Sequence, residues 1–149
     1  MTTVFDIQNF INTIAPFDTM KEWDNSGFLI GDASAPVTRC VLSLDATHAV
    51  VDFTLGMGAE LLLTHHPVIF KGLRQIPAGS VVSELISNHI QVLAAHTCYD
   101  KADGGISDCL AELLGLCNLR HPAEFITVGE LDAVMSVDDL AELVSGTLE

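Results

Sequence analysis

Two adjacent histidines, His65 and His66, are the residues whose type and position most clearly suggest chemistry. They follow a short apolar segment, residues 61–64, of the kind that forms a buried strand, and Pro67 then prevents further strand pairing. Neutral imidazole is the commonest metal ligand in proteins, so the pair is a candidate metal site. The alternative is that both histidines cap a strand end and hydrogen-bond to nearby backbone.

A second polar group follows the apolar segment 91–95. His96, Cys98 and Asp100 alternate along the chain, so in an extended backbone their side chains would share one side. Asp100 is a candidate carboxylate ligand. His96 could be a metal ligand, a residue that orients the ligands or a proton carrier. We assign it the last two roles together, as a catalytic residue, against the alternative of a structural histidine. Cys98 is expected to be incidental to the site.

His65, His66 and Asp100 form a partial ligand set for Zn²⁺, Mn²⁺ or Fe²⁺. Adjacent histidines in an extended backbone point to opposite sides, so the two imidazoles are expected to be poorly placed to bind one ion. They suit two neighbouring ions better, with a carboxylate shared or close by. A pair of metal ions lowers the pKa of a bridging water and polarises an oxygen atom, which is the chemistry of hydrolysis.

The elements that must position these residues alternate between strands and helices. Hydrophobic patterns predict strands at residues 28–30, 39–45, 61–64, 91–95 and 125–128. Helices are predicted at residues 3–15, 47–57, 80–88, 104–114 and from 137 onward. This alternation indicates an α/β fold with a mostly parallel sheet flanked by helices, and residues 1–149 are interpreted as a single domain.

The polar residues fall at the ends of the predicted strands. Asp45 ends one strand, the two adjacent histidines end the next, and residues 96–100 end a third. In a parallel sheet these three groups would lie along one edge, where open α/β sheets bind their ligands.

The composition limits the kinds of partner. The chain has 20 acidic and 6 basic residues, so we expect neither nucleic acid nor membrane surfaces as partners. The sequence shows no signal peptide, no C-x-x-C pair and no apolar stretch of about 20 residues, which predicts a cytoplasmic protein. Hydrophobic residues make up 49%, which favours a homo-oligomer or a face covered by a further domain.

Four motifs, in order along the chain, resemble the Nif-three-like dinuclear-metal family, whose members are often named GTP cyclohydrolase I type 2 homologues. The motifs are WDNSGFLIG (23–31), LSLDAT (42–47), LLLTHHPVIFKG (61–72) and AAHTCYDKADGGISDCLAELLGL (94–116). The resemblance implies a Nif-three-like fold, toroidal hexamers and two metal ions per subunit.

The same resemblance implies roles for individual residues. His65 and His66 match the paired histidine ligands, Asp100 matches the carboxylate ligand, and His96 matches the histidine beside the site. The family usually has asparagine where Cys98 stands. Family proteins continue into a second half that supplies a further histidine and glutamate. The chain therefore resembles the amino-terminal half of a family protein, and we expect it to hold one metal ion or fewer.

The function that follows is that of a divalent-metal-binding protein and metal-dependent hydrolase with a small-molecule or nucleotide-like substrate. The cofactor would be Zn²⁺, Mn²⁺ or Fe²⁺. Basic residues that could meet a triphosphate are scarce, with Lys71, Arg74 and Lys101 the candidates near the site. The alternative is a non-catalytic interaction or regulatory protein in which the metal stabilises the structure.

Overall fold

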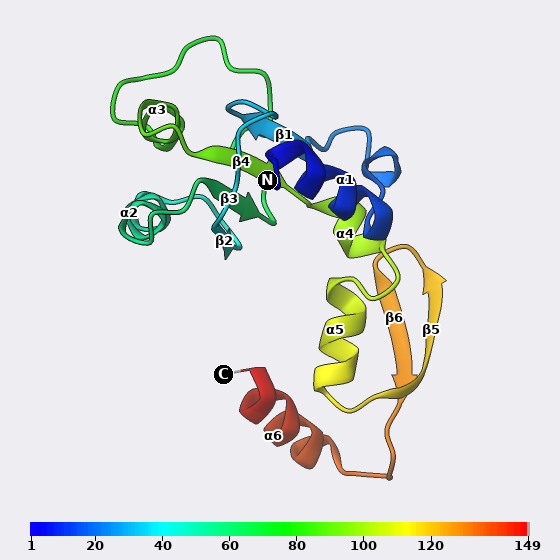
Figure 1. Ribbon diagram of the computed structural model, residues 1–149. Coiled ribbons are helices and arrows are strands. Elements are labelled where there is room, and N and C mark those ends of the chain that lie inside the picture. The colour runs from blue at the N-terminus through cyan, green and yellow to red at the C-terminus, as the bar shows by residue number, and fades with distance from the viewer. Residues whose placement is uncertain (149) are drawn as a thin grey trace. The chain divides into compact units, whose positions relative to one another are not determined.

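The structure is a computed structural model that describes residues 1–148 (Figure 1). The chain divides into two compact units, Met1–Tyr99 and a second unit that begins at Asp100. The first unit contains α1 (Val4–Ile14), the 3-10 helix η1 (Phe17–Thr19), β1 (Gly27–Ile30), β2 (Cys40–Ser43), α2 (His48–Gly56), β3 (Leu61–Thr64), α3 (Val81–Ser87) and β4 (Gln91–Ala94). The short helix α4 (Thr97–Lys101) contains the boundary between the units. None of the helices within residues 1–148 is long and apolar enough to cross a membrane.

A four-stranded sheet in the order β1-β4-β3-β2 forms the centre of the first unit. β2, β3 and β4 are parallel and in register, so that Ser43, Thr64 and Ala94 lie side by side at their carboxyl ends. β1 pairs antiparallel with β4. The predicted α/β fold with a mostly parallel sheet is therefore confirmed, and the strand ends that carry the polar residues share one edge.

Helices cover both faces of this sheet (Figure 1). Leu61 and Leu62 are adjacent in β3 and fully buried, yet they belong to two different clusters because successive strand residues point to opposite faces. Leu62 packs in the cluster that includes residues of α2 and α3, whereas Leu61 packs with residues of α1. Burying each such side chain contributes about 1.5–3 kcal/mol to the stability of the fold. Packing on both faces therefore fixes the position of the sheet and of its carboxyl edge.

The predicted helix starts are confirmed by their caps. Thr3 and Asp6 form a capping box at α1, in which each side chain accepts a hydrogen bond from the other residue's backbone N–H. Thr47 caps α2 and Ser80 caps α3 through a single bond each, which the side chain accepts from a backbone N–H of the first turn. These caps set where the helices begin relative to the strands.

Residues 96–100 do not remain extended, because the chain turns into α4 directly after His96. A helical turn starts here because the side chain of Asp24 accepts hydrogen bonds from both the backbone N–H and the hydroxyl of Thr97. His96, Cys98 and Asp100 therefore do not line up on one side of a strand.

The second unit contains α5 (Ile106–Leu113), a hairpin of β5 (Cys117–Ala123) and β6 (Ile126–Glu130), and α6 (Val137–Leu148). The sequence did not predict β5. Its residues are mostly exposed and include Pro122, so it lacks the apolar alternation that identifies a strand. Its pairing with β6 gives it strand structure, across a turn in which Phe125 adopts a positive φ of 64°.

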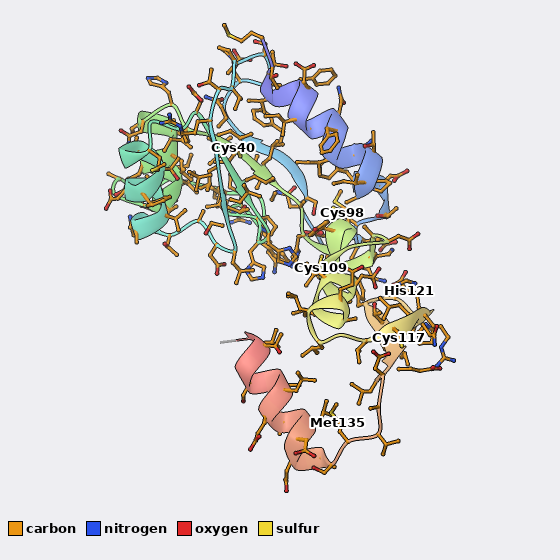
Figure 2. All side chains as sticks on the ribbon, turned by 60° about the horizontal axis from the view of Figure 1, so that its bottom comes forward. Cys40, Cys98, Cys109, Cys117, His121 and Met135 are labelled. Atoms are coloured by element: carbon orange, nitrogen blue, oxygen red, sulfur yellow. The ribbon has the colours of Figure 1, made fainter. Side chains whose placement is uncertain are left out.

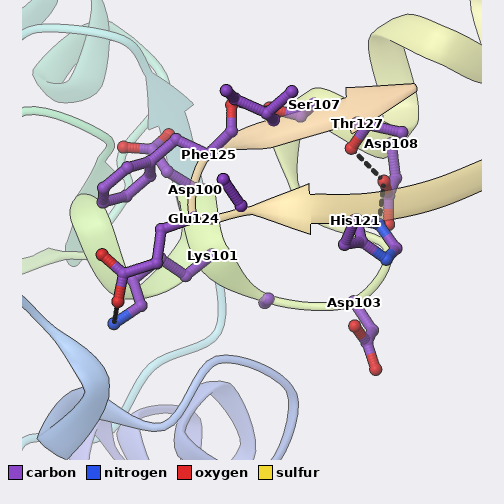
Figure 3. A pocket seen from close by; sticks show the side chains of 12 residues that line it. Asp100, Lys101, Asp103, Ser107, Asp108, His121, Glu124, Phe125 and Thr127 are labelled. Carbon is purple, nitrogen blue, oxygen red and sulfur yellow. Dashed lines mark hydrogen bonds and ion pairs between the residues drawn. The ribbon is translucent and has the colours of Figure 1, made fainter.

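Asp108 connects α5 to this hairpin. Its carboxylate accepts hydrogen bonds from the Gly104 N–H (2.8 Å), from Nε2 of His121 (2.8 Å) and from the Thr127 hydroxyl (2.6 Å), the last two drawn in Figure 3. The bonds from Thr127, His121 and Gly104 lower the pKa of Asp108 to about 2, and the bond to Asp108 raises the pKa of His121.

These two shifts predict the pH range in which the second unit is most stable. Asp108 stabilises it above its unfolded pKa of 3.8, and this contribution is lost as the pH falls toward 2. His121 stabilises it fully below its unfolded pKa of 6.5, and this contribution is lost as the pH rises through the raised folded value. Urea unfolding followed by NMR signals of β5 and β6 should therefore give the highest midpoint between pH 3.8 and 6.5.

The matched control for this prediction is His121→Gln, which keeps an N–H donor for Asp108 but does not titrate. In that variant the fall in urea midpoint above pH 6.5 should disappear. A native protein whose midpoint does not change across this range would show that the pair does not stabilise the unit.

Candidate metal centre

Three histidines come together at the carboxyl edge of the parallel sheet. His65 and His66 follow β3 directly, and His96 follows the neighbouring strand β4 after one residue. One potential ligand atom from each ring lies within 4.8 Å of the other two. The ring centroids are 4.9 to 5.5 Å apart. The two adjacent histidines and the more distant one are thus parts of one cluster.

The expectation that the adjacent histidines point apart is wrong. The backbone N–H of His65 donates to the carbonyl group of Ser43 (3.1 Å), the last residue of β2, and that of His66 donates to the carbonyl group of Leu44 (2.9 Å), directly after β2. In an extended strand successive N–H groups point to opposite sides, so the chain must bend at this point. The bend turns both imidazoles toward His96.

Each histidine of the cluster is held through its Nδ1 atom. The acceptors are the Ala95 carbonyl oxygen for His65 (3.0 Å), the Asp45 carboxylate for His66 (2.7 Å) and the Asp24 carboxylate for His96 (3.0 Å). Because a neutral imidazole that donates through Nδ1 carries its lone pair on Nε2, all three rings present Nε2 as the metal-binding atom. This pattern is the usual support of metal-ligating histidines, and three nitrogen donors suit Zn²⁺, Mn²⁺ or Fe²⁺.

Asp24 is the buried support of the cluster. Its side chain is fully inaccessible to solvent, whereas Asp45, which supports His66, is 54% exposed. Besides His96, Asp24 accepts from the Thr97 N–H (3.1 Å) and hydroxyl (2.5 Å) and from the Ser26 hydroxyl (3.0 Å). Burial would raise the pKa of Asp24, but these hydrogen bonds outweigh it and hold the pKa below its usual value. Asp24 is therefore a charged acceptor that fixes the orientation of His96.

Asp24 is not among the predicted site residues, although it lies within the motif WDNSGFLIG (23–31). Asp24 reaches His96 because β1 pairs with β4, and that pairing joins residues more than 60 positions apart. The available signal was a carboxylate among turn-forming residues directly before a strand. That signal is too common to single out a site.

Asp100, the predicted carboxylate ligand, is the first residue of the second unit and lies in α4. There it lines a cavity of about 280 Å³ together with Lys101, Asp103, Asp108 and residues of the hairpin (Figure 3). Lys101 forms an ion pair with Glu124 at 3.1 Å on the rim of this cavity. Among the described residues, the cluster of potential metal ligands consists of His65, His66 and His96.

Cys98 lies in α4 next to this cluster in the sequence and is completely buried. Burial raises the pKa of its thiol, and the charge of Asp24 adds to the effect. A neutral buried thiol is a weak ligand, so Cys98 acts here as a small core residue.

The four cysteines should differ in reactivity accordingly (Figure 2). Cys109 and Cys117 are exposed, whereas burial raises the pKa of both Cys40 and Cys98. In native protein a thiol reagent such as dithionitrobenzoate should label Cys109 and Cys117 rapidly and Cys98 only after unfolding in urea. Peptide mapping by mass spectrometry identifies the labelled positions. Rapid labelling of native Cys98 would show that α4 opens readily.

The fold and the cluster define an α/β protein with a candidate metal centre at the end of a parallel sheet. Residues 2–149 match the family description Duf34/NIF3 (NGG1p interacting factor 3). The chain therefore belongs to this family, and the resemblance found in its motifs is confirmed.

Two curated relatives both bear the name GTP cyclohydrolase 1 type 2 homolog. The one from Clostridium perfringens is 40% identical over 155 residues, which cover 96% of this chain and 59% of the relative. The one from Staphylococcus aureus strain Mu50 is 35% identical over 119 residues, which cover 78% of this chain and 32% of the relative. The chain thus spans between about a third and three fifths of the length of these relatives.

Solved structures show the same fold. A hypothetical protein of Staphylococcus aureus superposes with a TM-score of 0.89 at 26% identity, covering 98% of this chain and 64% of that chain. HcgD from Methanocaldococcus jannaschii, in its reduced form, superposes with a TM-score of 0.83 at 28% identity. The superposition covers 97% of this chain and 60% of HcgD. These superpositions extend over nearly the whole of this chain.

Proposed function

We propose that this chain binds one divalent metal ion, Zn²⁺, Mn²⁺ or Fe²⁺, through Nε2 of His65, His66 and His96. The observation that carries the proposal is that an oxygen acceptor engages Nδ1 of each ring, at 2.7 to 3.0 Å. The carboxylate role expected for Asp100 stays a prediction, because Asp100 belongs to the second unit. In this proposal His96 becomes a ligand rather than a proton carrier, because its Nε2 cannot bind a metal ion and move a proton at the same time.

We further propose that the bound ion serves a hydrolase that acts on a small-molecule or nucleotide-like substrate. A divalent ion at this place lowers the pKa of water and polarises a substrate oxygen. The chain's own contribution is to hold the imidazoles. Asp24 fixes His96 from the core, and Asp45 and the Ala95 carbonyl fix the other two rings. The names of the relatives support this class of activity.

The competing proposal is a non-catalytic protein in which the metal holds the fold together. The core argues against it, because the sheet is packed on both faces by apolar clusters that do not include the histidines. Each histidine also has a hydrogen-bond partner within the chain. The fold should therefore survive removal of the metal.

A chelation experiment separates the two proposals. Protein loaded with Zn²⁺ should lose its ion to excess EDTA. Its far-ultraviolet circular dichroism should stay the same, and its urea midpoint should fall only by the linkage effect of ligand release. Elemental analysis before chelation should give at most one ion per chain. Loss of secondary structure on chelation would support the structural role instead, and a metal-free protein after incubation with Zn²⁺, Mn²⁺ and Fe²⁺ would exclude both.

A further inference from the structure

Two exposed aromatic rings lie beside the histidine cluster. Trp23 and Phe70 are 58% and 41% exposed, and their ring centroids are 5.8 Å apart. Both rings also approach His96, at 6.0 and 6.1 Å between centroids and nearly edge-on. Neither ring belongs to the apolar clusters that pack the sheet. Their exposed surface is therefore not required by the core, and it adjoins the candidate metal centre.

The loops that carry the two rings are tied to each other and to the core. The side-chain amide of Asn25, two residues after Trp23, donates to the carbonyl oxygen of Ile69, directly before Phe70, at 2.6 Å. Between Trp23 and Asn25 lies Asp24, whose buried carboxylate is bonded to His96. The rings are thus held in position before any ligand arrives, which reduces the entropy lost on binding.

The size and surroundings of this ring pair indicate the kind of ligand. A protein interface commonly buries more than about 1,200 Å², which is far more than two ring faces can provide. Flat aromatic surfaces bind planar rings by stacking. Three imidazole nitrogens nearby would meet polar atoms on the edge of such a ring, which a purely hydrocarbon ring does not have.

We propose that Trp23 and Phe70 form an aromatic platform that binds the planar heteroaromatic ring of a small molecule, with polar atoms of the ring facing the histidine cluster. This inference rests on the proposed function, because it names the substrate class for the same site. It assigns Trp23 and Phe70 as binding residues that determine specificity, and it makes no use of the metal for the stacking itself.

The test uses Trp23 as its own reporter, because it is the single tryptophan of the chain. Adenosine, guanosine and nicotinamide are titrated into the full chain, with tryptophan excited where these probes do not absorb, and ribose serves as the non-aromatic control. At least one ring probe should quench the emission of Trp23 saturably, and ribose should not. The titrations are run on chelated protein and on protein incubated with Zn²⁺.

Phe70→Leu removes one ring and keeps the reporter, and we expect it to weaken binding about tenfold, within the range known for the loss of one stacking partner. Phe53→Leu is the matched control, because Phe53 is 60% exposed but belongs to α2 and does not contact the cluster rings. It should bind as the native chain does. Circular dichroism checks that both variants fold.

The outcomes distinguish this inference from the metal proposal. Saturable quenching in chelated protein, weakened in Phe70→Leu, supports the platform even where no Zn²⁺ binds, and the metal proposal then fails alone. Absence of saturable quenching by every ring probe, with and without Zn²⁺, overturns the platform. Equal affinity of Phe70→Leu and the native chain also overturns it, whatever the metal content.

Discussion

Replacing His65, His66 or His96 singly by alanine should lower the affinity for Zn²⁺ more than about 100-fold. Each change removes one of the three nitrogen donors that converge at the edge of the sheet. Altering a residue that merely supports a ligand costs about 10- to 100-fold in metal affinity, so loss of a ligand itself should cost more. Competition titration against a chromophoric chelator measures the affinity of each variant.

The matched control is His48→Ala, because His48 is an exposed histidine that pairs with Glu84 (2.8 Å) outside the cluster. Its affinity for Zn²⁺ should be that of the native chain. If all three cluster variants bound Zn²⁺ as tightly as the control, the ion would be held elsewhere in the chain.

Replacing Asp24 by alanine should lower the free energy of unfolding by about 3 kcal/mol, since it leaves several partly buried donors without an acceptor. The donors are Nδ1 of His96, the hydroxyl of Ser26, and the N–H and hydroxyl of Thr97. The same change frees the ring of His96 and should weaken Zn²⁺ binding by about 10- to 100-fold. Urea unfolding and metal titration measure the two effects separately.

Asp45→Ala provides the comparison, because Asp45 supports His66 as Asp24 supports His96 but is 54% exposed. Exposed pairs of this kind contribute about 1 kcal/mol or less to stability. Asp45→Ala should therefore weaken Zn²⁺ binding with little change in the free energy of unfolding. Equal destabilisation by the two aspartate variants would show that the burial of Asp24 does not matter.

Local sequence patterns were sufficient to predict most of the first unit. The apolar run at residues 61–64 coincides with β3, and Thr3, Thr47 and Ser80 cap the helices that follow them. Each of these features depends on neighbouring residues, through side-chain alternation or through a hydrogen bond within one helical turn. Because the strands are parallel, the polar residues at their carboxyl ends must lie along one edge of the sheet.

The features that the sequence did not reveal depend on distant parts of the chain. The bend that turns His65 and His66 the same way is fixed by the carbonyl groups of the last residue of the neighbouring strand β2 and of the residue after it. Asp24 reaches His96 through the antiparallel pairing of β1 with β4, which no local pattern encodes. The strand β5 likewise owes its structure to its partner β6, since its own residues do not alternate.

X-ray absorption at the zinc edge tests the central claim most directly, because it reports the atoms bound to the ion. In native protein with one equivalent of Zn²⁺ we expect nitrogen and oxygen neighbours at about 2.0–2.2 Å, with the outer-shell scattering of imidazole rings. That imidazole signal should fall in His65→Ala, His66→Ala and His96→Ala and remain unchanged in His48→Ala. Sulfur neighbours at about 2.3 Å, or an imidazole signal unaffected by all three cluster variants, would contradict it.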